Sequence, residues 1–238
     1  MKVYLSPSTQ EKNIGTGKYG SEEQRMNELC NLVEVELLKQ GFHTKRNNPE
    51  MTLHEVVYDS NAWQPNIHVA LHSNAGGGSG LETWHYPSQE GTRLSRCIHT
   101  QLVKVIPFPD RGLKKSTSFL ELHGTVAPAC IVEVIFHDNK DEAPWLIDNM
   151  KPVAAAITKG ICDYFNVQYH SGEKRVQLDT PVRLVDVDDD NYVAVGQLRP
   201  ILEALGAFVY YDAGEITVIG RDKILKLQVG GRDMTIIE

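Results

Sequence analysis

Residues 66–84 read NIHVALHSNAGGGSGLETW, and the predicted fold follows from this stretch. Residues 66–71 form a largely apolar run of the length of a buried strand. The polar segment 72–75 comes directly after it, followed by the glycine-rich loop 76–80 and an aromatic, strand-like segment over residues 81–86. Open α/β sheets place their functional groups where strands end in loops. The stretch therefore predicts a sheet that carries polar side chains at its edge.

The segments on either side alternate between strand and helix patterns up to residue 165. Strand patterns cover residues 2–5, 42–46 and 129–135, and helical patterns cover residues 21–40, 53–62, 92–106 and 152–165. Such alternation is typical of layered α/β architectures. We therefore expect an α/β fold with a mixed, mostly parallel sheet flanked by helices on both faces.

The pattern changes at the polar segment 166–174, which has the composition of a linker. Short strand-like runs follow at residues 175–184, 192–195, 207–211, 215–219 and 224–229, with one helical run at 198–205. We predict two domains: a first domain over residues 1–167 and a small C-terminal α+β module over residues 174–238.

The composition excludes several classes of protein. The chain has 238 residues, 41% of them hydrophobic, and a net charge of −7, which argues against a protein that binds nucleic acid through many cationic contacts. No apolar stretch approaches the roughly 18 residues needed to span a bilayer, so we expect no membrane insertion. The first residues lack the apolar core of a secretory signal, which predicts synthesis in the cytoplasm. The four scattered cysteines indicate reduced core thiols.

Three side chains are candidates for chemistry. Glu133 lies inside the apolar run 129–136, where a carboxylate is costly unless it is paired, protonated or near a metal. His72 follows an apolar strand, and Glu22 opens the first long helix. Taken alone, His72 is equally well explained as a structural histidine, and Glu22 as a first-turn carboxylate on the helix dipole.

Taken in order, these segments resemble a known family. The resemblance spans about residues 2–165 and rests on VYLSPS near the N-terminus, GSEE at the entry of the first helix, HVALHSNAGGGSGLETW, PDRGLKK and APACIVEVIFHDN. The family is the zinc-dependent N-acetylmuramoyl-L-alanine amidases, often called amidase-3, and the chain is most similar to a branch associated with sporulation and phage lysis.

The resemblance implies a zinc hydrolase site with peptidoglycan as its substrate. Carried over by position, Glu22 and His72 bind Zn²⁺, with Glu23 as the fallback for the helix carboxylate, and Glu133 is the general base. The bond cleaved would be the amide between N-acetylmuramic acid and L-alanine of the stem peptide. The alternative is a catalytically inactive protein that binds muropeptide or cell wall.

The third zinc ligand of the family would fall at Thr9, where this sequence has no histidine. Gln10 is the nearest candidate, although an amide oxygen is a weaker zinc ligand than imidazole or carboxylate. The alternatives are His137 or His123, which lie near the Glu133 strand in sequence, and water.

Three further residues are candidates for contact with substrate: Asn74, Glu82 and His137. Trp84 is either a sugar-stacking side chain or, slightly favoured, a packed strand aromatic. Without a secretory signal, the protein is expected to reach the wall after release, through phage lysis or mother-cell lysis.

The C-terminal module resembles the small domain named after the N-terminal stalk of copper amine oxidases, through VAVGQLRPILEALGAFVYYDAGEITV over residues 193–218. It has no histidines for a copper site, because none follows His170. The resemblance implies a wall-associated or dimerisation module, and hence a possible homodimer.

Overall fold

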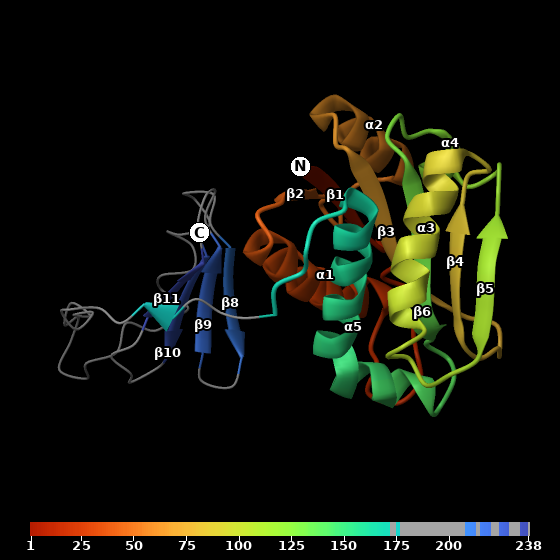
Figure 1. The fold of residues 1–238 in the computed structure, drawn as a ribbon. Coiled ribbons are helices and arrows are strands. Elements are labelled where there is room, and N and C mark those ends of the chain that lie inside the picture. Colours follow the sequence, from red (N-terminus) through yellow and green to blue (C-terminus); the bar gives the residue numbers. More distant parts are fainter. Residues whose placement is uncertain (172–174, 177–207, 213–214, 220–223, 229–233, 238) are drawn as a thin grey trace. The chain divides into compact units, whose positions relative to one another are not determined.

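The computed structural model describes residues 1–171, 175–176, 208–212, 215–219, 224–228 and 234–237, and for the residues from 175 onward it describes the backbone alone (Figure 1). The chain divides into two compact units, Met1–Tyr169 and His170–Glu238. No helix in the described part of the chain is long and apolar enough to cross a membrane.

The first unit alternates strands and helices along the chain. Its elements are β1 (Lys2–Pro7), α1 (Glu22–Lys39), β2 (His43–Arg46), α2 (Leu53–Trp63), β3 (Ile67–Asn74), β4 (Leu81–His85), α3 (Gln89–Leu102), β5 (Asp110–Lys115), α4 (Leu120–His123), β6 (Ala129–Phe136) and α5 (Glu142–Phe165). The helix starts follow local chemistry: Ser21 caps α1 by accepting from the Gln24 amide, and Thr52 and Glu55 form a capping box at α2.

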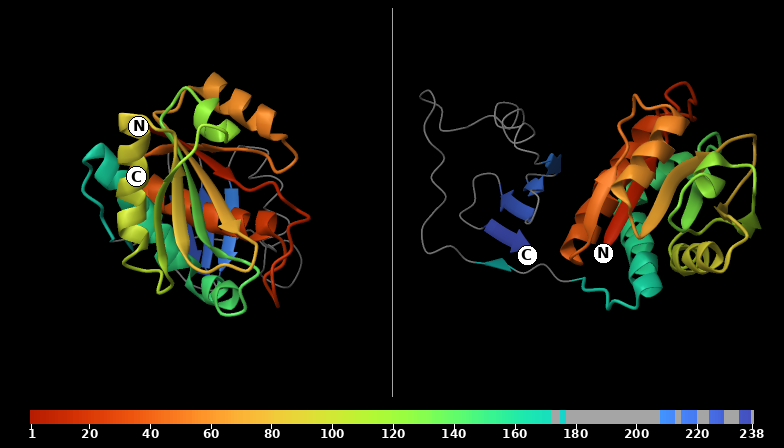
Figure 2. Two further views of the ribbon diagram at one scale, coloured as in Figure 1. Left: turned by 90° about the vertical axis from the view of Figure 1, so that its right-hand side faces the viewer. Right: turned by 90° about the horizontal axis from the view of Figure 1, so that it is seen from above.

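The six strands form one sheet in the order β2-β1-β3-β6-β4-β5. Every neighbouring pair is parallel except β4 and β6, which are antiparallel. Helices α1, α3 and α5 cover one face, and α2 and α4 lie at one end of the other face (Figure 2). The predicted mixed, mostly parallel sheet with helices on both faces is confirmed.

Alternation along the strands separates the core from the functional face. On β3, Val69 and Leu71 belong to the main core with α1, α3 and α5, so His68 and His72 face the opposite side. The register pairs His72 with Glu133 across β3 and β6, and Glu133 with Glu82 across β6 and β4. Three neighbouring strands therefore place an imidazole and two carboxylates side by side on one face.

Some elements differ from the prediction. Strand β3 continues through Asn74 because its backbone stays paired with β6 up to Phe136, across an irregularity between His72 and Asn74. Helix α5 begins at Glu142, ten residues before the predicted start at 152, and has non-helical angles at Asn149. Proline lacks an amide donor and disrupts the preceding turn, so Pro152 accounts for this kink. Strand β5 and the short helix α4 were not predicted.

The second unit contains β7 (Arg175–Val176), β8 (Phe208–Asp212), β9 (Glu215–Ile219), β10 (Ile224–Gln228) and β11 (Met234–Ile237). They form an antiparallel sheet in the order β7-β11-β10-β9-β8. Strands β8, β9 and β10 lie within a residue of the predicted runs, whereas β11 was not predicted. The predicted helix at 198–205, the strand at 192–195 and most of the run at 175–184 lie outside the described residues.

Candidate functional site

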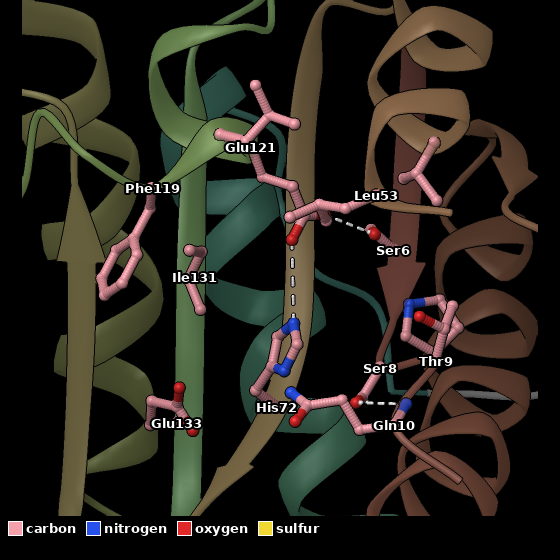
Figure 3. A pocket seen from close by; sticks show the side chains of 13 residues that line it. Ser6, Ser8, Thr9, Gln10, Leu53, His72, Phe119, Glu121, Ile131 and Glu133 are labelled. Atoms are coloured by element: carbon pink, nitrogen blue, oxygen red, sulfur yellow. Dashed lines mark hydrogen bonds and ion pairs between the residues drawn. The ribbon is translucent and has the colours of Figure 1, made fainter. Parts of the chain in front are cut away.

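A cavity of about 320 Å³ opens on the sheet face that carries His72 and Glu133 (Figure 3). It is bounded by the end of β1 and the turn after it, the start of α2, strands β3 and β6, and α4. Its lining residues are Ser6, Pro7, Ser8, Thr9, Gln10, Leu53, Val56, His72, Phe119, Leu120, Glu121, Ile131 and Glu133.

Glu22 and His72 form a direct pair at this cavity. His72 Nδ1 donates to Glu22 Oε1 at 2.8 Å, and Asn13 Nδ2 donates to Glu22 Oε2 at 2.5 Å. Glu22 is buried at the first position of α1, where the partial positive charge of the helix favours a carboxylate. Burial alone would raise the pKa of Glu22, but the hydrogen bonds from His72 and Asn13 outweigh it and lower that pKa.

Glu121 approaches the other side of the His72 ring. Its Oε2 lies 3.7 Å from His72 Nε2, and its Oε1 accepts from Ser6 Oγ at 2.5 Å (Figure 3). The same Oε1 accepts from His68 Nε2 at 3.0 Å. Burial opposes the charged imidazolium and lowers the pKa of His72. The carboxylates of Glu121 and Glu22 outweigh this effect and hold the pKa well above its ordinary value.

Glu133 differs from the other two carboxylates in its hydrogen bonding. Its Oε2 is buried and has no hydrogen bond within the described part of the chain. Burial raises the pKa of Glu133 to about 7; the charge of His72 opposes the rise, and the charges of Glu22, Glu82 and Glu121 add to it. A carboxyl group with a pKa near neutrality can both accept and release a proton.

The turn after β1 brings Thr9 and Gln10 to the same cavity. The backbone N–H of Gln10 donates to Ser8 Oγ at 3.2 Å, which fixes the turn. The Gln10 side chain extends towards His72 (Figure 3). Among the described residues, that side chain makes no hydrogen bond, so its amide is available to a ligand.

Comparison with known proteins identifies this arrangement. The family model described as N-acetylmuramoyl-L-alanine amidase (Amidase_3) matches residues 3–163, which include every element that lines the cavity. The chain belongs to this amidase family.

Two curated relatives and one solved structure illustrate the similarity. The chain is 25% identical over 177 residues to the N-acetylmuramoyl-L-alanine amidase CwlM of Bacillus licheniformis, covering 70% of each chain. It is 24% identical over 190 residues to the sporulation-specific N-acetylmuramoyl-L-alanine amidase of Bacillus subtilis, covering 75% of this chain and 74% of the relative.

The solved structure is the catalytic domain of CwlV, an N-acetylmuramoyl-L-alanine amidase of Bacillus (Paenibacillus) polymyxa var. colistinus. It superposes with a TM-score of 0.64 at 22% identity, over 70% of this chain and 99% of that domain. The first unit therefore has the fold of an amidase catalytic domain.

The family implies zinc, and the donor atoms of this amidase fit that ion in part. The imidazole Nδ1 of His72 and the carboxylate of Glu22 face each other at 2.8 Å, near the separation of about 3.3 Å for two ligands of one tetrahedral zinc ion. Within the described residues, no group of three or more His, Cys, Asp or Glu side chains could hold a metal ion. Within the part of the chain that the structure describes, Glu22 and His72 are the pair of strong zinc donors brought together at this site.

The alternative histidines do not reach the cavity. His137 is buried, with Nε2 3.1 Å from Asn13 Oδ1 and Nδ1 2.9 Å from the Ser73 hydroxyl. These hydrogen bonds hold the His137 ring against Asn13, the residue that donates to Glu22. His123 is exposed at the end of α4. Neither residue lines the cavity.

Asn74 and Glu82 lie beside the cavity without lining it. Asn74 Nδ2 donates to Glu82 Oε1 at 3.0 Å, and Trp84 Nε1 donates to the same oxygen at 3.0 Å. The other oxygen, Oε2, accepts from Arg111 Nε at 2.6 Å and lies 2.7 Å from Lys114 Nζ. Burial would raise the pKa of Glu82, but the hydrogen bonds from Arg111 and Lys114 lower it.

Glu121, Asn13 and the two cations on β5 were not predicted from the sequence. Glu121 belongs to a helix of four residues, which is too short to show a periodic pattern. Asn13 sits in an irregular turn. For Glu121, the available signal was a carboxylate between Leu120 and Leu122.

Proposed function

We propose that this amidase hydrolyses the amide between the lactyl group of N-acetylmuramic acid and L-alanine of the peptidoglycan stem peptide. The observation that carries the proposal is the buried Oε2 of Glu133, which has no hydrogen-bond partner among the described residues. Glu133 lines the same cavity as His72, whose ring is paired with Glu22. Burying a carboxylate oxygen without a hydrogen bond costs free energy, and a bound ligand or a proton on the carboxyl group removes that cost. Family membership supplies the reaction class.

We further propose that Glu22 and His72 hold a zinc ion, with the Gln10 amide oxygen as a third ligand. When bound, zinc polarises the scissile carbonyl and acidifies water, which is worth several kcal/mol of charge stabilisation. The Glu22 carboxylate and the His72 imidazole are both common zinc ligands, which supports this assignment. With Gln10 they make three protein ligands, and catalytic zinc sites of this kind keep a fourth position open for water.

Glu133, Glu121 and Asn13 have separate roles in the proposed reaction. Glu133 Oε2 accepts a proton from the attacking water and delivers it to the departing L-alanine nitrogen, which its pKa of about 7 allows. Glu121 holds the ring of His72 from its Nε2 side, so that Nδ1 points to Glu22. Asn13 holds the second oxygen of Glu22.

The direct test is digestion of purified peptidoglycan with the zinc-loaded full chain. New N-terminal L-alanine without new reducing sugar ends is expected, because only the lactyl amide is cut. Glu133→Gln, which keeps the shape of the side chain but cannot accept the proton, should lower the rate by about 100-fold or more. Glu50→Gln removes an exposed carboxylate outside the cavity and serves as the control. Release of reducing ends, or full activity of Glu133→Gln, contradicts the proposal.

The second candidate is an inactive protein that binds muropeptide. Two observations favour it: Thr9 stands where the family's first ligand would fall, and the described residues contain no group of three or more His, Cys, Asp or Glu side chains that could hold a metal ion. Zinc content of protein purified without chelator separates the candidates. About one zinc per chain, lost on Gln10→Ala, supports the catalytic site with an unusual ligand. Zinc kept in Gln10→Ala moves the third ligand to water, and absence of zinc from both proteins favours the binding protein.

For the second unit, we propose a copper-amine-oxidase-N-like module that associates with the wall or pairs two chains into a homodimer. The resemblance over residues 193–218 supports this assignment. We also propose that the protein acts at the cell wall after release from the cell, by phage lysis or by lysis of a mother cell.

A further inference from the structure

Two cations converge on one carboxylate beside the candidate base. Arg111 Nε and Lys114 Nζ lie 2.6 and 2.7 Å from the same oxygen of Glu82. Glu82 is the residue directly opposite Glu133 across β4 and β6. The pair of cations therefore lies one strand beyond the residue that faces Glu133.

The backbone of β5 is built to bring these cations together. Arg111 and Lys114 are three residues apart, and in a regular strand such residues point to opposite faces. The β4–β5 register shifts between Leu81 and Thr83, opposite Arg111 and Gly112, and Gly112 has a φ of 78°, which favours glycine. Asp110 Oδ1 accepts from the Gly112 amide at 2.8 Å and fixes the bulge. Bulges commonly re-aim side chains next to functional sites.

The positive charge of Arg111 and Lys114 exceeds the negative charge of Glu82. One buried carboxylate faces two cations, so the cluster carries a net charge of +1. The Arg111 side chain is 36% exposed and that of Lys114 is 30% exposed, whereas Glu82 is 4% exposed. Within the described part of the chain, Arg111 hydrogen-bonds to Glu82 through Nε alone, which leaves its two terminal nitrogens for a ligand. The ring of Phe136, 4.9 Å from the guanidinium carbon, supports that group from one side.

The separation from Glu133 fits one group of the proposed substrate. Neighbouring strands lie about 4.8 Å apart, so β5 lies about 10 Å from β6. In an extended stem peptide, the α-carboxylate of the second residue lies about 7 Å from the scissile carbonyl carbon, since successive Cα atoms are 3.8 Å apart. The side chains of Arg111 and Lys114 are long enough to span the difference between the strand separation of about 10 Å and the peptide length of about 7 Å. The glycan side offers no such anion, because the lactyl carboxyl group is itself the amide to be cut.

We propose that Arg111 and Lys114 form a receptor for a free carboxylate on the second stem-peptide residue, so that this amidase prefers stems whose second residue is not amidated. The inference rests on the proposed function for the placement of the substrate. Charge-assisted hydrogen bonds to a carboxylate are among the stronger polar contacts, and a carboxamide cannot replace them.

Binding to the full-length Glu133→Gln protein tests the receptor without requiring cleavage. The probes are two synthetic ligands that differ in one group: N-acetylmuramoyl-L-alanyl-D-glutamate with its α-carboxylate free, and the same compound with that group amidated. Calorimetry should give about tenfold tighter binding of the free acid. Adding Arg111→Gln or Lys114→Gln should bring the ratio close to one, while Glu82 keeps its remaining partners. Lys115→Gln removes the same charge from the next, exposed position of β5 and should leave the ratio unchanged.

Equal affinity for the two ligands, or a preference that survives both Arg111→Gln and Lys114→Gln, overturns the receptor. Cleavage of the two ligands by the chain with Glu133 intact is measured separately. If neither ligand is cleaved but the binding preference stands, the hydrolase proposal fails and the receptor holds. If both are cleaved and bound alike, the receptor alone fails.

Discussion

At the scale of single residues, the charge state of Glu133 changes near neutral pH. In the folded, metal-free protein its pKa is about 7, above the ordinary value of 4.5. Between these two pH values the folded state binds more protons than the unfolded state, so the stability that Glu133 contributes is lost as pH rises through about 7. At pH 8 the buried charge destabilises the fold by up to about 3 kcal/mol.

Glu133→Gln should therefore be more stable than the unchanged chain at pH 8, with the advantage falling towards zero or reversing at pH 5. Urea denaturation in the presence of a chelator at the two pH values measures the difference. Glu50→Gln, which changes an exposed carboxylate, should show no such pH-dependent gain. A constant difference between pH 5 and pH 8 would mean that Glu133 is not held neutral by the fold.

We predict that Glu121 acts as a positioning residue for His72. Its carboxylate fixes the ring from the Nε2 side, and partners of this kind typically change metal affinity by about 10–100-fold. We predict that Glu121→Gln weakens zinc binding by about this factor while the fold persists, because the amide keeps the hydrogen bond from Ser6. Competition with a zinc-binding dye measures the affinity. Glu34→Gln changes another buried glutamate, paired with Thr44, and should leave zinc binding intact. Unchanged affinity in Glu121→Gln would refute the positioning role.

At the scale of elements, the helix pair α3 and α5 depends on one glycine. A Cβ added at Gly160 would lie 2.3 Å from the Ile98 Cα and 2.8 Å from the Ile98 amide nitrogen. Both are backbone atoms of α3, so the contact cannot be relieved by turning a side chain. Alanine ordinarily favours an isolated helix by about 1 kcal/mol over glycine, but here the steric clash reverses the sign.

We predict that Gly160→Ala destabilises the first unit by about 1–3 kcal/mol. Thermal unfolding followed by circular dichroism tests this value. Lys159→Ala, at the neighbouring exposed position of α5, should change stability by less than about 1 kcal/mol. An increase in the melting temperature of Gly160→Ala would show that α3 and α5 can separate at no cost.

For the whole molecule, the first unit contains the entire cavity and its own core. All lining residues and every member of the main core cluster lie within residues 1–169. We predict that a chain ending at residue 171 folds alone and cleaves soluble muropeptide at the rate of the full chain, while its binding to intact walls falls. Rates on both substrates and co-sedimentation with walls measure the two effects. A truncated chain that fails to fold would show that the second unit is part of the catalytic fold.

The order of strands and helices was largely readable from the sequence, because apolar periodicity reports burial directly. The sequence also singled out Glu133, since a carboxylate inside an apolar strand stands out locally. Glu22 and His72 became candidates for zinc binding through the family resemblance. The missed elements were those with weak periodicity. Strand β5 is bulged at Gly112, and α4 has a single turn.

Tertiary structure alone decided which side chains meet. Glu121 joins Ser6, 115 residues away, and His68, 53 residues away, because strand order brings β1, β3 and the segment before β6 together. It also placed His137 behind Asn13 and brought Arg111 and Lys114 to Glu82 through a backbone bulge. The sequence by itself determined the apolar periodicity of the strands and helices and the cost of burying Glu133 inside an apolar strand. The partners of the site residues depend on strand order and register, which are set by long-range packing and leave no local pattern.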